Sequence, residues 1–101
     1  MNNKLKKRLR TIGHELKPVV TIAGNGLSES VLAELNRALN DHELIKARVV
    51  GDREERKAMA AEIGAIEDLE IVQSIGGILL LYRPSREPDP SKSNILRSGV
   101  V

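Results

Sequence analysis

The chain of 101 residues has no cysteine, tryptophan or phenylalanine, and one tyrosine, Tyr82. Without cysteine it can form neither a disulfide framework nor a cysteine-based zinc site. Without aromatic platforms it cannot stack the bases of single-stranded nucleic acid, as sheet-type and OB-type proteins do. No apolar run approaches the roughly 18 residues of a membrane helix, and no apolar segment follows the basic N-terminus as in a secretory signal. We therefore expect a cytoplasmic protein with no membrane contact.

Charge is unevenly distributed along the chain. The net charge of +2 divides into +5 for residues 1–26, −5 for residues 27–82 and +2 for residues 83–101. A basic end beside an acidic body favours the binding of a polyanion on one side. A solvated, charged first helix would have the same composition, so charge alone leaves both interpretations open.

Hydrophobic periodicity and turn residues predict the order α-β-α-β-α-β-β. The expected elements are helices over about 3–13, 29–40 and 52–64, and strands over 19–22, 44–50, 69–75 and 78–82. Gly76-Gly77 between the last two strands is a hairpin signal. Because a strand-helix-strand unit requires parallel strands, we expect one α/β domain over residues 1–84 with a mixed, four-stranded sheet. Three prolines and scattered polar residues from Arg83 onward predict a disordered tail over 85–101.

The turn between the first strand and the second helix is the most informative stretch. Ala23-Gly24-Asn25-Gly26 follows the strand, and Ser28 can cap the helix. Glycine lets another backbone approach closely, and the free N–H groups of a helix start favour an anion. The stretch therefore predicts a phosphate-binding turn, and Lys17 upstream adds a cation.

Enzymatic interpretations of the sequence fail on spacing. Glu29 occupies the third glycine position of the dinucleotide motif, and no Gly-Lys-Ser/Thr follows the glycines as in a P-loop. Asp41-His42-Glu43 is typical of a polar helix-to-strand turn, and no His-x-x-x-His spacing exists for a metal. We expect no catalysis, no metal and no cofactor.

Several segments at consistent spacing, from about Leu5 to Pro84, resemble the YhbY/CRM RNA-binding domain, the chloroplast RNA splicing and ribosome maturation family. They are Leu16–Val20 (LKPVV), Gly26-Leu27, His42–Val49 (HELIKARV) and Leu81–Pro84 (LYRP). The resemblance implies a fold like the C-terminal domain of translation initiation factor three, and RNA binding. For free-standing bacterial members it also implies association with precursors of the large ribosomal subunit.

The RNA-contact loop of that family is a GxxG turn, which here has Ala23 in place of the first glycine and no cation between its ends. We therefore expect the positive charge to come from the first helix, from Lys17 and from the second strand. Lys46 and Arg48 share one face of that strand, so this part of the sheet is expected to be open. The predicted RNA-binding residues are Lys6, Lys7, Arg10, Lys17, Ala23, Gly24, Asn25, Gly26, Lys46 and Arg48.

The resulting hypothesis is a monomeric protein that docks electrostatically on folded ribosomal RNA and assists assembly of the large subunit. DNA and small-molecule substrates are not expected. An alternative is a protein-binding adaptor whose basic N-terminal helix docks an acidic partner. A third interpretation, a small phosphometabolite binder, would need a closed pocket near Gly24–Ser28.

Overall fold

The predicted order of elements is confirmed in the computed structural model, which describes residues 2–23 and 26–97 and adds a short last helix. The predicted ends agree with the observed ones within two residues. In the described part of the chain, no helix has the length and apolar character needed to cross a membrane. The elements are α1 (Asn3–Gly13), β1 (Pro18–Ile22), α2 (Glu29–His42), β2 (Leu44–Val49), α3 (Arg53–Gly64), β3 (Glu70–Ile75), β4 (Ile78–Tyr82) and α4 (Asn94–Arg97).

Side-chain caps determine where α2 and α3 begin. The hydroxyl of Ser28 accepts from the amide of Val31 at 3.3 Å. The Asp52 carboxylate accepts from the Glu55 amide at 2.8 Å, while the Glu55 carboxylate accepts from the Asp52 amide at 3.1 Å. This reciprocal pair is a capping box, as the spacing of the two acids predicts.

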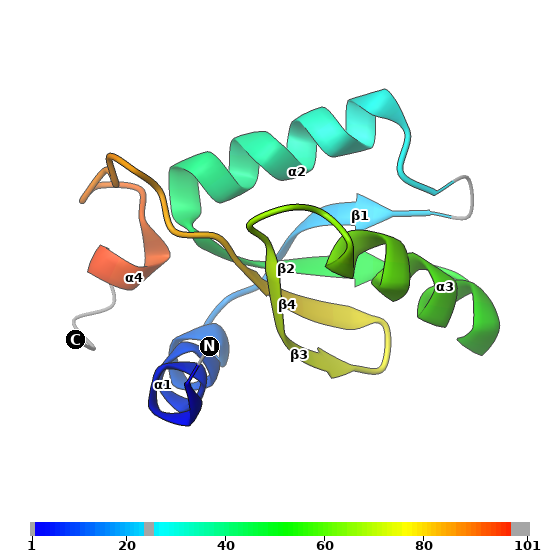
Figure 1. Ribbon diagram of the computed structural model, residues 1–101, viewed down its shortest axis with the longest axis horizontal. Coiled ribbons are helices and arrows are strands. Elements are labelled where there is room, and N and C mark those ends of the chain that lie inside the picture. Colours follow the sequence, from blue (N-terminus) through cyan, green and yellow to red (C-terminus); the bar gives the residue numbers. More distant parts are fainter. Residues whose placement is uncertain (1, 24–25, 98–101) are drawn as a thin grey trace.

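The sheet has the strand order β1-β2-β4-β3 (Figure 1). β1 and β2 are parallel, and both other pairs are antiparallel. The carboxyl ends of β1 and β2 therefore lie at one edge. The β3–β4 turn lies there too, since the amide of Val49 donates to the carbonyl of Gly77. We refer to this edge, with Ala23, residues 26–28, Gly51-Asp52 and Gly76-Gly77, as the loop edge.

The two faces of the sheet are covered unequally. α2 and α3 lie over one face and enclose the main core, which includes Val20, Ile22, Leu35, Leu39, Ile45, Ala47, Ile63, Leu79 and Leu81. α1 lies on the other side of the sheet (Figure 1), where Leu9 and Ile12 pack on residues of β2, β3 and β4. This second face stays open toward the loop edge, where the side chain of Ile75 is 65% exposed.

The segment after β4 differs from the predicted disordered tail over residues 85–97. Ser93 is fully buried and donates its hydroxyl to Glu43, and the Ser85 amide donates to the other oxygen of that carboxylate. The side-chain amide of Asn94 donates to the carbonyl of Leu44 at 2.7 Å. The segment is ordered because it supplies donors to a buried carboxylate far away in the sequence, which local composition cannot indicate.

Candidate nucleic-acid interface

Three of the predicted cations line one groove between α1 and the sheet. Lys7 and Arg10 come from α1 and Lys46 comes from β2. Lys46 is half-buried, whereas the two α1 cations are exposed. We refer to this groove, lined by Lys7, Arg10, His14, Lys46, Ile75 and Ile78, as the α1 groove. Three positive side chains from two separate elements are thus brought around one open surface.

The last residue of α1 brings the helix close to the sheet. A Cβ at Gly13 would lie 2.7 and 2.8 Å from the two methyl groups of Leu80 on β4. Leu80 is buried, so only glycine permits this separation without repacking. Arg10 and Lys7 lie about one and two helical turns before Gly13, and the close approach of the helix to the sheet holds them beside Lys46.

The other predicted cations are distributed differently. Arg48 is exposed and pairs in register with Ile78, so it extends the face of Lys46 toward the loop edge. Lys6 is half-buried on α1, and Lys17 is exposed in the connection to β1. Neither Lys6 nor Lys17 lines the α1 groove. The prediction of an open sheet therefore holds for Arg48, while Lys46 is partly covered.

The GxxG-like turn is described only at its two ends, and Gly24 and Asn25 lie outside the described residues. Ala23 is exposed, and its carbonyl accepts from the amide of Gly26 at 3.0 Å. Gly26 has a φ of +79°, which favours glycine. The two ends therefore form a closed turn just before the capped start of α2.

The side of this turn that faces α3 is acidic. A shallow hollow there is lined by Ala23, Gly26, Met59, Glu55 and Glu62. Two carboxylates beside the turn disfavour an anionic ligand on that side. This side of the turn therefore does not suit a phosphate. A closed pocket for a phosphorylated metabolite, which the third interpretation requires, does not occur in the described residues around the turn.

A second cationic groove, which was not predicted from the sequence, lies between α3 and the β3–β4 hairpin. Its lining includes Arg53, Arg56, Lys57, Ser74, Gly76 and Gly77. Arg53, Arg56 and Lys57 are spaced i, i+3 and i+4, which places them on one side of a helix. That spacing could be read from the sequence, and so could the hairpin. The sequence did not indicate that the hairpin lies opposite these three cations. We refer to this surface as the α3 groove.

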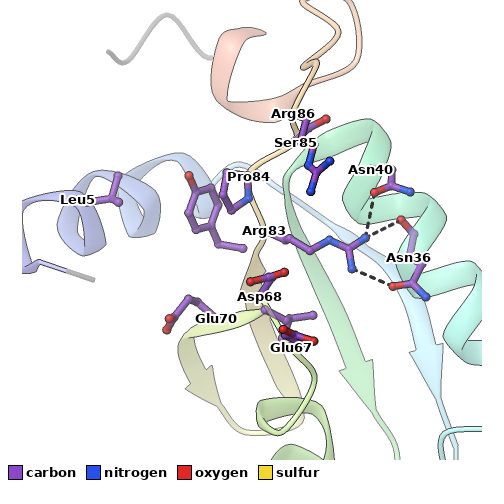
Figure 2. A pocket seen from close by; sticks show the side chains of 12 residues that line it. Leu5, Asn36, Asn40, Glu67, Asp68, Glu70, Arg83, Pro84, Ser85 and Arg86 are labelled. Carbon is purple, nitrogen blue, oxygen red and sulfur yellow. Dashed lines mark hydrogen bonds between the residues drawn. The ribbon is translucent and has the colours of Figure 1, made fainter.

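A hollow larger than either groove lies away from the loop edge (Figure 2). One of its two arginines, Arg83, donates to the side-chain oxygens of Asn36 at 2.9 Å and Asn40 at 3.0 Å, and to the Asn36 carbonyl at 3.1 Å. The guanidinium thus joins the end of β4 to α2. The opposite wall carries the acidic side chains of Glu67, Asp68 and Glu70, so this hollow does not suit a phosphate.

The single aromatic side chain, Tyr82, packs at the edge of the cluster under α1. Burial, and secondarily the negative charge of Glu43, raises the pKa of its hydroxyl. Tyr82 is therefore neutral at physiological pH, and this half-buried ring cannot by itself form a platform that stacks successive bases.

The Asp41-His42-Glu43 turn has a structural role. His42 Nδ1 lies 2.8 Å from the carbonyl oxygen of Lys92, at hydrogen-bonding distance, and Glu43 accepts from Ser85 and Ser93. In the described part of the chain no group of three or more histidine, aspartate and glutamate side chains is arranged to hold a metal ion.

Comparison with known families matches residues 1–83 to the CRS1/YhbY (CRM) domain. The chain belongs to this family. The resemblance inferred from the short segments is thereby confirmed. A probable RNA-binding protein of Pseudomonas aeruginosa is 48% identical to this chain over 97 residues. The matched residues cover 95% of this chain and 93% of the relative. An RNA-binding protein of Haemophilus influenzae is 49% identical over 88 residues, 86% and 89% of the two chains.

A solved structure has the same CRM fold. The solution structure of a hypothetical protein from Staphylococcus aureus superposes with a TM-score of 0.72 at 30% sequence identity, covering 86% of this chain and 92% of the other. The predicted fold class, one α/β domain with a four-stranded mixed sheet, is confirmed.

Proposed function

We propose that this CRM protein binds structured RNA through the α1 groove and the neighbouring open face of the sheet. The observation that carries the proposal is the convergence of Lys7, Arg10 and Lys46 on one groove, with Arg48 on the same face beyond it. The two bacterial relatives named as RNA-binding proteins support the choice of RNA as the polyanion.

Affinity in this interface comes from phosphates. Lysine and arginine side chains release condensed counterions when they contact a nucleic-acid backbone, so binding weakens as salt rises. Since the chain has only one aromatic side chain and so no stacking platform, the RNA is recognised by its folded shape, phosphates and 2′-hydroxyls. The turn that begins at Ala23 and ends at Gly26 adds backbone amides near the start of α2, where an anion is favoured.

We further propose that the RNA belongs to the precursor of the large ribosomal subunit, and that the protein assists its assembly as a cytoplasmic monomer. The proposal rests on the CRM family membership together with the basic interface. Binding and positioning of RNA, without covalent chemistry, account for the site residues.

Sedimentation of the tagged protein from its own cell lysate through a sucrose gradient, at low and moderate salt, tests the ribosomal part. Comigration with large-subunit precursors that is lost as salt rises is the expected result. Protein that stays at the top of the gradient in both salts would exclude a stable ribosomal association.

Charge reversal of the open face tests the RNA interface. The double variant Lys46→Glu/Arg48→Glu should bind a folded ribosomal RNA fragment roughly tenfold more weakly, with a salt slope smaller by about two. The matched control Arg37→Glu/Arg86→Glu changes the net charge equally at exposed sites outside both grooves. If both variants lost the same affinity, net charge rather than this face would explain the binding.

A further inference from the structure

The charges of α3 are sorted by the side of the helix on which they lie. Arg53, Arg56 and Lys57 line the α3 groove together with the hairpin. Glu55 and Glu62 line the hollow on the opposite side, beside the GxxG-like turn. The cationic side of α3 is therefore aimed at the β3–β4 hairpin.

The hairpin is the shared wall of both cationic grooves. Ile75 and Ile78 line the α1 groove on one face of the sheet. Ser74, Gly76 and Gly77 line the α3 groove. Because alternate residues of a strand point to opposite faces, the cations of α1 and β2 lie on one side of the hairpin, and those of α3 lie on the other.

The tip of the hairpin is thin and unobstructed. Gly76 has a φ of +59°, and a Cβ there would meet no atom within 4 Å. At Gly77 a Cβ would lie 2.7 Å from the carbonyl oxygen of Val49 and 3.5 Å from Cδ of Arg56. The missing side chain thus lets β2 and Arg56 pack directly against the turn, and Arg56 is held beside the tip. Ile75, next to the turn, is 65% exposed.

From this arrangement we infer that the β3–β4 turn enters the minor groove of an RNA duplex, with the two phosphate strands lying on the α1 groove and the α3 groove. This inference rests on the proposed RNA binding and adds the part of the RNA that is recognised. The minor groove of A-form RNA is wide and shallow and displays 2′-hydroxyls, whereas its major groove is too narrow for side chains. The glycine tip and the Ser74 hydroxyl suit close contact with those 2′-hydroxyls.

The test uses the full chain, a mixed-sequence RNA duplex of about 16 base pairs and a DNA duplex of the same sequence. Arg53→Glu/Lys57→Glu reverses two exposed charges of the α3 groove and leaves the packed Arg56 in place. Position 53 lies in the first turn of α3, where negative charge is favourable, and position 57 is exposed, so this variant should keep its fold, which circular dichroism checks. It should bind the RNA duplex about tenfold more weakly, with a salt slope reduced by about two.

The controls separate this inference from the proposed function. Arg37→Glu/Arg86→Glu should retain more of the affinity than the α3 variant at equal net charge. If the α3 variant matched this control while Lys46→Glu/Arg48→Glu still lost binding, the α3 groove would lie outside the interface, and RNA binding by the α1 groove would stand. If the unmodified protein bound neither the duplex nor folded ribosomal RNA, the proposed function itself would fail.

A second measurement concerns the hairpin tip. Ile75→Glu places a negative charge on an exposed side chain between the two phosphate strands, and Ile75→Gln is its neutral counterpart. The glutamate variant should weaken binding to the RNA duplex several-fold more than the glutamine variant, because like charges repel. Equal binding by the two variants, or equal affinity of the unmodified protein for the RNA and DNA duplexes, would overturn insertion into the minor groove.

Discussion

The hydroxyl of Ser93 donates to a carboxylate oxygen of Glu43 at 2.6 Å, joining residues that are 50 positions apart in the sequence. Glu43 is 6% exposed and follows α2 with a φ of +62°. Its other carboxylate oxygen accepts from the Ser85 amide at 2.9 Å. A buried carboxylate requires such donors, so this pair attaches the C-terminal segment to the turn between α2 and β2.

Replacing Ser93 by alanine should destabilise the protein. The variant leaves the buried Glu43 carboxylate without one donor, which costs roughly 1–3 kcal/mol. The free energy of unfolding from urea titration measures the effect. Ser91→Ala is the control, because Ser91 also donates to a carboxylate, that of Asp89 at 2.7 Å, but at an exposed site. Equal stabilities of the two variants would show that the buried pair contributes nothing.

The glycines that end α1 and α3 should respond oppositely to alanine. Gly13→Ala puts a methyl group less than 3 Å from the buried Leu80, and overpacking of this kind costs about 1–3 kcal/mol. In Gly64→Ala the new Cβ lies 3.5 Å from Cδ1 of Ile71, an ordinary contact. That variant should gain roughly 0.4–1 kcal/mol, since alanine loses less backbone entropy on folding. Thermal unfolding of both variants tests the pair, and a destabilised Gly64→Ala would contradict it.

Asp52 gives stability a specific pH dependence. The backbone amide of Glu55, which donates to its carboxylate, holds the pKa of Asp52 below the ordinary value of 3.8. The folded state therefore favours the charged form. The resulting stability is present above the ordinary pKa and is lost as the pH falls through the lower folded pKa.

Asp52→Asn isolates this contribution, because asparagine caps a helix as well as aspartate but does not titrate. The unmodified protein should be the more stable of the two at neutral pH, and the difference should shrink as the pH falls below about 4. Urea unfolding across this range measures the difference. A difference that stayed constant with pH would mean that Asp52 titrates alike in the folded and unfolded chains.

Arg83 should not tolerate replacement by lysine. Its guanidinium donates three hydrogen bonds to Asn36 and Asn40 on α2, and a single ammonium group cannot reproduce that fork. Arg83→Lys should cost about 1–2 kcal/mol of unfolding free energy while leaving RNA binding unchanged. Arg86→Lys, at an exposed position on the same segment, should be neutral. A loss of RNA affinity without a loss of stability would place Arg83 in the interface instead.

Much of the candidate interface could be predicted from the sequence, and some of it could not. Lys7, Arg10 and Lys46 were assigned from charge pattern and family resemblance, and the structure brings them together. Lys6 and Lys17 have the same charge but do not line the groove. The difference depends on the angle and distance at which α1 packs, which the contact between Gly13 and Leu80 sets.

The sequence by itself determined the order of elements, the capped starts of α2 and α3, the glycine hairpin and the CRM family, because periodicity, capping and turn chemistry act between residues that are close in the chain. Only the tertiary structure decided that Ser93 donates a hydrogen bond to Glu43 and that the cations of α3 face the hairpin. Each of these contacts joins residues far apart in the chain, and they form only when the packed sheet and helices bring such residues together.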